Sequence, residues 1–262
     1  MVRLIKKVSK GTRFNQIYLQ KNEAGFGPGE TVVISPITDI IDQELPIFEY
    51  NIKLSSLKKE IVKKIFKIID DLGSYGNILI TGSFLDEGFN FEDMDIVIID
   101  PKINKEKVEN SIKEMGILPH LILIDSKSFD RGIKKEPLFR LMVDRFVSIK
   151  RTIFREEKDI NYRLLDANLF HSKNLIDAYE ILSIKERKKL LRDFISIKLF
   201  AEDKEVTLNN VKKEADNLFG KDVIKELFYY GNNEAKTKFI SKFKKEFNVL
   251  QNKVMGNASK QA

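Results

Sequence analysis

The apolar residues between positions 55 and 73 follow the period of an α-helix. They recur every three or four residues, as expected for a helix with one buried face. The residues that keep this spacing are Leu57, Ile61, Ile65 and Ile68, with Ile69 beside the last of them. Ser55 or Ser56 can cap the beginning of this helix, and Gly73 follows its end.

Short apolar runs follow this helix, and one further helical stretch separates the last two of them. The pattern predicts a strand, then a turn or short helix from Gly82, a second strand, a lysine-rich helix and a third strand. The predicted strands are 77–81, 94–100 and 120–125, and the predicted helix is 104–116. Alternation of strands and helices at this spacing indicates an α/β unit.

The two ends of the chain have different patterns. Glycine and proline interrupt short β-branched runs such as "TVVIS" near the N-terminus, whereas helical signals dominate from about residue 150. Ser183 and Glu186 form a capping box, and Thr207 can cap the next helix. We therefore predict a small β domain, an α/β core and an all-helical C-terminal domain, covering 1–38, 39–155 and 156–262.

Composition narrows the class of protein. Hydrophobic residues make up 42% and charged residues 32% of the 262 positions, which is typical of a globular chain. The absence of cysteine excludes disulfides, thiolate zinc sites and a cysteine nucleophile, and His120 and His171 are the two histidines. No apolar run is long enough for a membrane span, and the first residues lack signal-peptide features, so we expect a cytoplasmic protein.

The formal net charge of +7 allows two interpretations. A basic protein attracts phosphate-bearing partners such as nucleotides, RNA or DNA. The same charge can instead reflect a solvated lysine-rich surface. The net charge alone does not distinguish between these two interpretations.

The stretch "ITGSFLDEGFNFEDMDIVIID" carries the clearest chemical signal. On an extended chain, Asp93 and Asp95 project from the same side, about 6–7 Å apart. That spacing suits two divalent cations about 4 Å apart, each bound by oxygen atoms. Gly82 and Ser83 follow the preceding strand, where glycine lets the backbone approach a phosphate closely. The other interpretation is a capped turn with two solvated aspartates.

Gly-Ser after one strand and Asp-x-Asp at the start of the next resemble the signature of the DNA polymerase beta nucleotidyltransferase superfamily, above all its minimal members. The resemblance covers residues 55 to about 130. It implies that Gly82 and Ser83 contact the phosphates of a nucleoside triphosphate. It also implies that Asp93 and Asp95 bind divalent metal, with two Mg²⁺ ions expected.

The chain departs from that family at one position. A third carboxylate usually stands early in the following strand, where this sequence has His120, and Asp125 stands at the far end. His120 can be a metal ligand or base, or simply a hydrogen-bonded histidine. Asp125 can serve as a metal ligand if the strand register differs. In a further alternative the domain binds nucleotide without transferring it. The nearby carboxylates Asp86, Glu87 and Glu92 are interpreted as surface or capping groups.

The N-terminal segment has a second, shorter resemblance. "PGETVVI", residues 28–34, is similar to part of the AbrB-type swapped-hairpin domain, which implies dimerisation and contact with DNA. The basic residues that would contact phosphates are Arg3, Lys6, Lys7, Lys10 and Arg13. Gln20 is not followed by the proline that the family often has. The alternative is a small β extension packed on the core.

The C-terminal helices mix basic and aromatic residues. The basic stretch consists of Lys185, Arg187, Lys188, Lys189 and Arg192. The aromatic residues are Phe194, Phe200, Phe228, Tyr229, Tyr230, Phe239, Phe243 and Phe247. Such a mixture can stack nucleic-acid bases, but the four-residue spacing of the last three favours a core face. "RFVSIKRTIFR", 145–155, combines a predicted last strand with cations that can reach a triphosphate.

These features together predict a magnesium-dependent nucleotidyltransferase. An acceptor hydroxyl, with RNA such as a tRNA end as the favoured acceptor, would attack the α-phosphate of a nucleoside triphosphate and release pyrophosphate. The alternative is a dimeric nucleic-acid-binding regulator with an inactive or nucleotide-sensing nucleotidyltransferase fold. A third candidate class is an RNA-processing or toxin–antitoxin component.

Overall fold

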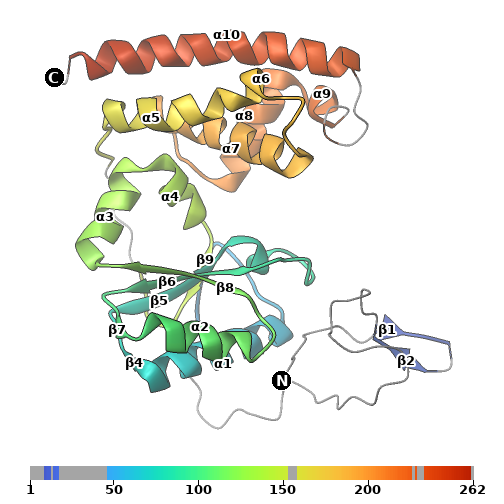
Figure 1. Cartoon of the computed structure of the whole chain (residues 1–262), viewed down its shortest axis with the longest axis vertical. Coiled ribbons are helices and arrows are strands. Elements are labelled where there is room, and N and C mark those ends of the chain that lie inside the picture. The colour runs from blue at the N-terminus through green and yellow to red at the C-terminus, as the bar shows by residue number, and fades with distance from the viewer. Residues whose placement is uncertain are drawn as a thin grey trace. The chain divides into compact units, whose positions relative to one another are not determined.

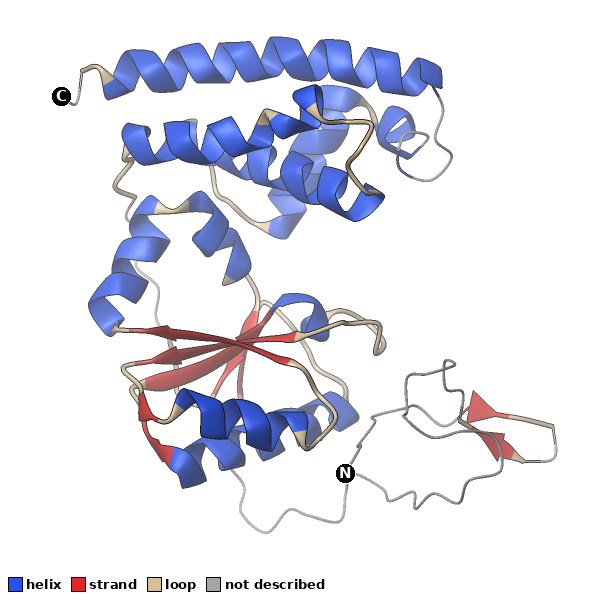
Figure 2. Ribbon diagram, in the orientation of Figure 1, coloured by secondary structure: helices blue, strands red, loops and turns tan. Residues whose placement is uncertain are grey.

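The computed structural model describes residues 9–12, 14–17, 46–152, 158–225, 228 and 233–260. The chain divides into two compact units, one formed by 1–129 with 145–153 and the other by 130–144 with 154–262. The first contains a mixed sheet with helices, and the second is helical (Figures 1 and 2). The chain is thus a mixed α and β protein, as the sequence predicts.

The first unit is built on a five-stranded sheet with the order β3-β9-β5-β6-β8 (Figure 1). The strands are β3 (Phe48–Tyr50), β5 (Asn77–Thr81), β6 (Met94–Ile99), β8 (Pro119–Ile124) and β9 (Phe146–Ser148). β6 and β8 are parallel, and the other neighbours are antiparallel. The predicted strands at 77–81, 94–100 and 120–125 are confirmed within one residue at each end.

Helices α1 (Ser56–Leu72) and α2 (Lys105–Lys113) cover one face of this sheet (Figure 1). The helical stripe predicted from the sequence supplies Ile61, Ile65 and Ile69, which are fully buried in one core with Ile96 and Ile98 of β6. Burial of each such side chain contributes about 1.5–3 kcal/mol to the free energy of unfolding. The Ser55 hydroxyl accepts a hydrogen bond from the Lys58 N–H, so Ser55 is the N-cap.

The remaining elements of the first unit are short. They are β1 (Ser9–Lys10), β2 (Asn15–Gln16), β4 (Gly73–Ser74), β7 (Lys102–Ile103) and the 3₁₀ turn η2 (Gly82–Leu85). β1 and β2 form an antiparallel pair, as do β4 and β7. "PGETVVI" and most of the N-terminal basic residues lie outside the described residues.

The second unit begins within α3 (Ser126–Lys135) and includes α4 (Pro137–Met142). Its other helices are α5 (Tyr162–Ser172), α6 (Asn174–Asp177), α7 (Ile184–Ala201), α8 (Leu208–Phe219), α9 (Lys221–Lys225) and α10 (Asn233–Ala258). Residues 130–144, predicted within 39–155, group with these helices because Leu141 belongs to their core.

Aromatic side chains form the centre of the helical core. Phe239, Phe243 and Phe247 of α10 are at most 2% exposed, and the Phe243 ring lies 4.6 Å from that of Phe194 in α7. Their spacing therefore reflects packing, and these rings are not available to stack bases. Tyr229 and Tyr230 lie outside the described residues. The predicted capping box at the start of α7 and the cap at the start of α8 are both confirmed.

Among the described helices, none combines the length and apolar character needed to span a membrane.

Candidate functional site

One edge of the sheet brings together residues that are far apart in the sequence. Asp95 of β6 lies directly between Thr81, the last residue of β5, and His120 in β8, since it pairs with both in the strand register. β9 runs antiparallel to β5, so Arg145, which precedes β9, lies near the same end of β5. The Thr81 hydroxyl donates to the Arg145 carbonyl at 2.8 Å, which fixes this juxtaposition.

Gly82 is required where the chain leaves this edge. Its φ of +76° lies in the region that favours glycine, and a Cβ built there would lie 2.1 Å from Asp95 Oδ2. No real Cβ–oxygen contact is that short, so a larger residue would displace the carboxylate. The glycine of the Gly-Ser pair therefore makes room for the second aspartate of Asp-x-Asp.

Asp95 also contacts His120. The imidazole Nδ1 lies 2.8 Å from Asp95 Oδ1, with the histidine side chain 60% exposed and the aspartate side chain 25% exposed. The two carboxylate oxygens thus have different neighbours: Oδ1 faces the imidazole and Oδ2 faces Gly82. Because the ring is largely exposed, a molecule from solvent can reach it. His120 therefore has the hydrogen-bond partner that the sequence interpretation allowed for.

Asp93 and Ser83 stand next to these residues in the chain. Asp93 is half-buried and immediately precedes β6, whose first residue, Met94, donates its N–H to the Leu118 carbonyl. Ser83 is exposed in η2. The predicted set of Gly82, Ser83, Asp93 and Asp95 thus occupies one edge, together with His120. η2 is a single turn of four residues, too short to provide the aligned dipoles of an α-helix.

Asp125 lies at the other end of β8. The parallel register places His120 beside Asp95 and Ile124 beside Ile99, so about 16 Å of strand separates Asp125 from the level of Asp95. Its carboxylate accepts the Ser128 N–H at 2.8 Å at the beginning of α3. Hydrogen bonds from Ser128 hold the pKa of this carboxyl below its ordinary value. The structure does not bring Asp125 together with the other candidate residues.

A buried lysine supports the turn after Gly82. Lys58 of α1 is 4% exposed, and its ammonium donates to the Phe84 carbonyl at 2.5 Å and to the Asp86 carbonyl. It lies over the rings of Phe84 and Phe89, at 5.1 and 5.5 Å from their centroids. Desolvation lowers the pKa of Lys58 and outweighs the opposing effect of Asp86. Lys58 therefore anchors the main chain that follows the Gly-Ser pair.

Sequence interpretation missed Lys58, although a signal was present. Lys58 precedes Ile61 and Ile65 by three and seven residues, so it occupies the apolar phase of the helix. The interpretation of Asp86 as a surface or capping group was incomplete, because its carboxylate pairs with Arg145 at 2.7 Å. Nothing in the local sequence links these two residues, which are 59 positions apart.

The donors at this edge fit a hard divalent cation. Carboxylate oxygens are the side-chain ligands that Mg²⁺ prefers, and Asp93 and Asp95 stand two residues apart at the entrance of β6. No group of three or more histidine and carboxylate side chains in the described ranges is spaced to hold a metal by itself. Mg²⁺ in phosphoryl-transfer sites commonly takes one or two carboxylates and completes its shell with phosphates and water. The donor set is compatible with that arrangement.

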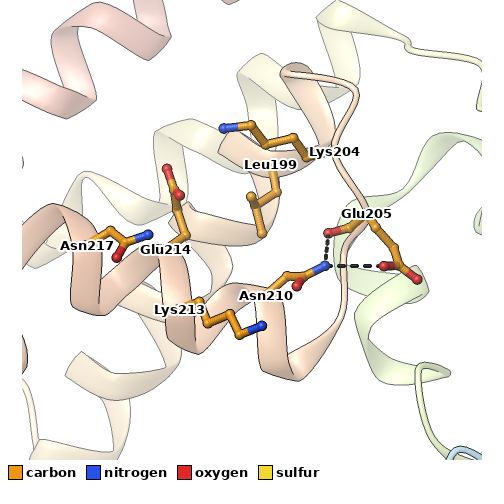
Figure 3. Close-up of a pocket in the computed structure, with 7 residues that line it drawn as sticks. All are labelled: Leu199, Lys204, Glu205, Asn210, Lys213, Glu214 and Asn217. Carbon is orange, nitrogen blue, oxygen red and sulfur yellow. Dashed lines mark hydrogen bonds between the residues drawn. The ribbon is translucent and has the colours of Figure 1, made fainter.

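The helical unit contains a separate hollow of about 400 Å³ beside α8 (Figure 3). The Asn210 amide in its wall donates to both the carbonyl and the carboxylate of Glu205. Glu214, also in the wall, accepts from Lys198 at 2.8 Å. Asn210, Glu205 and Glu214 in its wall thus already have hydrogen-bond partners within the protein.

No family model, curated protein or solved structure matches this chain.

Proposed function

We propose that this protein is a magnesium-dependent nucleotidyltransferase that moves a nucleoside monophosphate from a nucleoside triphosphate to an acceptor hydroxyl. The observation that carries the proposal is the close approach of Gly82 to Asp95 Oδ2. Asp95 in turn stands two residues after Asp93. This approach joins a glycine-containing turn and a pair of carboxylates at one sheet edge. Phosphates and their cation need those two components side by side.

Each residue has a distinct role in this proposal. The Gly82 main chain lets phosphate approach without a side chain in the way, and the exposed Ser83 hydroxyl donates to a phosphate oxygen. Asp93 and Asp95 Oδ2 would hold Mg²⁺. When bound, Mg²⁺ offsets the negative charge of the triphosphate and favours departure of pyrophosphate.

His120 supplies a base beside the carboxylates. When Nδ1 donates to Asp95 Oδ1, the neutral imidazole keeps Nε2 as its acceptor. The acceptor hydroxyl oxygen bonds to the α-phosphorus, its proton passes to Nε2, and the bond to the pyrophosphate oxygen breaks. Histidine thereby takes the place of the third carboxylate that the sequence lacks.

RNA is the acceptor that we favour, because the chain carries a formal net charge of +7. The test incubates the protein with each α-labelled nucleoside triphosphate, Mg²⁺ and separate pools of cellular RNA, protein and metabolites. We expect label to enter one pool with the wild type and not with Asp93→Asn. Nuclease sensitivity of the product would identify RNA.

Failure to transfer label to any pool would overturn the enzymatic proposal. If Mg²⁺-dependent nucleotide binding persisted in that case, a nucleotide-sensing regulator would be the better description. A salt-dependent shift of DNA that is lost on deletion of residues 1–38 would then support the regulator.

A further inference from the structure

Arg145 is a cation at the candidate edge for which the proposed mechanism has no use. Its main-chain carbonyl accepts the hydrogen bond from the Thr81 hydroxyl, which places it next to the residue that precedes Gly82. Its guanidinium pairs with Asp86 at 2.7 Å, and Asp86 directly follows the turn η2. The Arg145 side chain is 25% exposed and that of Asp86 is 59% exposed.

The contacts of this guanidinium are incomplete. Arg145 Nε is buried and has no hydrogen-bond acceptor among the residues that the structure describes. A buried N–H without an acceptor is unfavourable, and an ion pair with an exposed carboxylate contributes little. Because Nη2 bonds to a carboxylate that is 59% exposed, a ligand with several acceptor oxygens can compete with Asp86 for the guanidinium.

Lys58, a second cation that contacts this turn, cannot take that role. It is 4% exposed, and its ammonium already donates to two main-chain carbonyls, those of Phe84 and Asp86. These bonds hold the main chain of Asp86 in place, whereas its carboxylate reaches the surface. The turn thus has one cation bound by main-chain carbonyls, Lys58, and one cation paired with an exposed carboxylate, Arg145.

We propose that Arg145 binds phosphate oxygens of the nucleoside triphosphate, and that Asp86 occupies its guanidinium when no nucleotide is bound. Planar guanidinium groups bind phosphate in a bidentate manner, with short, charge-assisted hydrogen bonds. η2 is too short to offer a helix dipole, so a side-chain cation would add attraction to the contacts that Gly82, Ser83 and Mg²⁺ supply. The inference rests on the proposed function, since it assumes that phosphates lie at this edge. Asp86 and phosphate then compete for Arg145.

Competition between Asp86 and phosphate predicts that removal of the Asp86 charge strengthens nucleotide binding, although Asp86 lies beside the proposed binding site. Asp86→Asn should tighten binding of a nucleoside triphosphate with Mg²⁺ roughly two- to tenfold, because the guanidinium is released. Arg145→Gln should weaken it roughly tenfold or more. In the double variant, Asp86→Asn should give no gain over Arg145→Gln alone. Glu87→Gln is the matched control, since it removes a neighbouring exposed carboxylate that is outside the proposed pair.

Calorimetric titration with a non-hydrolysable triphosphate, and with inorganic tripolyphosphate, measures these effects. If the ion pair is only structural, Asp86→Asn will weaken binding or leave it unchanged, and the inference fails. Equal gains in nucleotide affinity for Asp86→Asn and Glu87→Gln would show that the effect comes from the loss of any nearby negative charge. That result would also overturn the inference. If Arg145→Gln does not fold, the inference is tested by the change in nucleotide affinity in Asp86→Asn compared with that in Glu87→Gln.

The same titrations separate this inference from the proposed function. Wild-type protein that binds neither ligand would overturn both. Binding with the predicted signs but no transfer of label would overturn only the enzymatic proposal. Binding and transfer with an unaffected Arg145→Gln variant would overturn only the role of Arg145.

Discussion

Gly82 and Asp95 are mutually dependent: a Cβ on residue 82 would lie 2.1 Å from Asp95 Oδ2. Gly88 provides an internal comparison, because it has the same φ of +76° and no atom beyond its two chain neighbours lies within 4 Å of the position that a Cβ would take there. Substitution of each glycine therefore distinguishes the energetic effect of backbone strain, which both positions share, from that of the steric clash with Asp95, which occurs only at Gly82.

Gly82→Ala should therefore lower the free energy of unfolding more than Gly88→Ala does. The positive φ alone costs roughly 1–2 kcal/mol in either variant. Gly82→Ala adds displacement of the Asp95 carboxylate, so we expect a further loss of about 1–3 kcal/mol and loss of Mg²⁺-dependent nucleotide binding. Chemical denaturation and nucleotide titration of both variants test this. Equal costs, with binding intact, would show that the space next to Asp95 is not restrictive.

His120→Gln should affect transfer much more than stability. The Asp95–His120 contact is partly exposed, with the histidine side chain 60% exposed, so its loss should change the free energy of unfolding by less than about 1 kcal/mol. Loss of a general base lowers rates by roughly 10²–10⁴-fold. His171→Gln is the control, as the exposed histidine of the helical unit. Comparable transfer rates in the two variants would exclude His120 as the base.

Lys58→Met should destabilise the first unit, because it leaves the Phe84 and Asp86 carbonyls without their ammonium donor. We expect a loss of about 1–3 kcal/mol. Lys59→Met, one residue along α1, removes a half-buried lysine whose ion pair with Glu49 is partly exposed, and should lower the free energy of unfolding by less than about 1 kcal/mol. Denaturation curves of the two variants give the comparison. A smaller loss in Lys58→Met than in Lys59→Met would contradict the anchoring role.

Asp193 in α7 should make stability depend on pH. This buried carboxyl has a pKa raised by desolvation, which outweighs the attraction of Arg192. An acid with a raised folded-state pKa destabilises the fold at pH values above that pKa, and the penalty disappears below the unfolded value of 3.8. Asp193→Asn should therefore be more stable than wild type at neutral pH, with the difference shrinking as the pH falls. A difference that does not change with pH would contradict this.

The sequence was informative wherever the signal was local. The apolar period predicted α1, and short apolar runs predicted β5, β6 and β8. Ser55, Ser183 and Thr207 were recognisable as caps because capping depends on neighbouring residues. β3 was missed because it is a three-residue strand whose pairing with β9 lies about 100 positions away.

The candidate site was predictable in its residues more than in its contacts. Local spacing identified Gly82 and Asp95, but the strand register was needed to place His120 beside Asp95 and Asp125 elsewhere. The Asp86–Arg145 pair depends on the same long-range pairing of strands. A single sequence gives no direct signal for such contacts.

The most direct test of the central claim compares Asp95→Asn with Asp100→Asn at the two ends of β6. Asp100 lies just beyond the strand with φ +48°, and its Oδ1 accepts the Ser126 N–H, a bond that asparagine can keep. The measurement is the initial rate of label transfer from an α-labelled nucleoside triphosphate with Mg²⁺. We predict near-wild-type transfer by Asp100→Asn and a loss of roughly a hundredfold or more in Asp95→Asn. Equal transfer by both variants, or none by the wild type, would contradict the proposal.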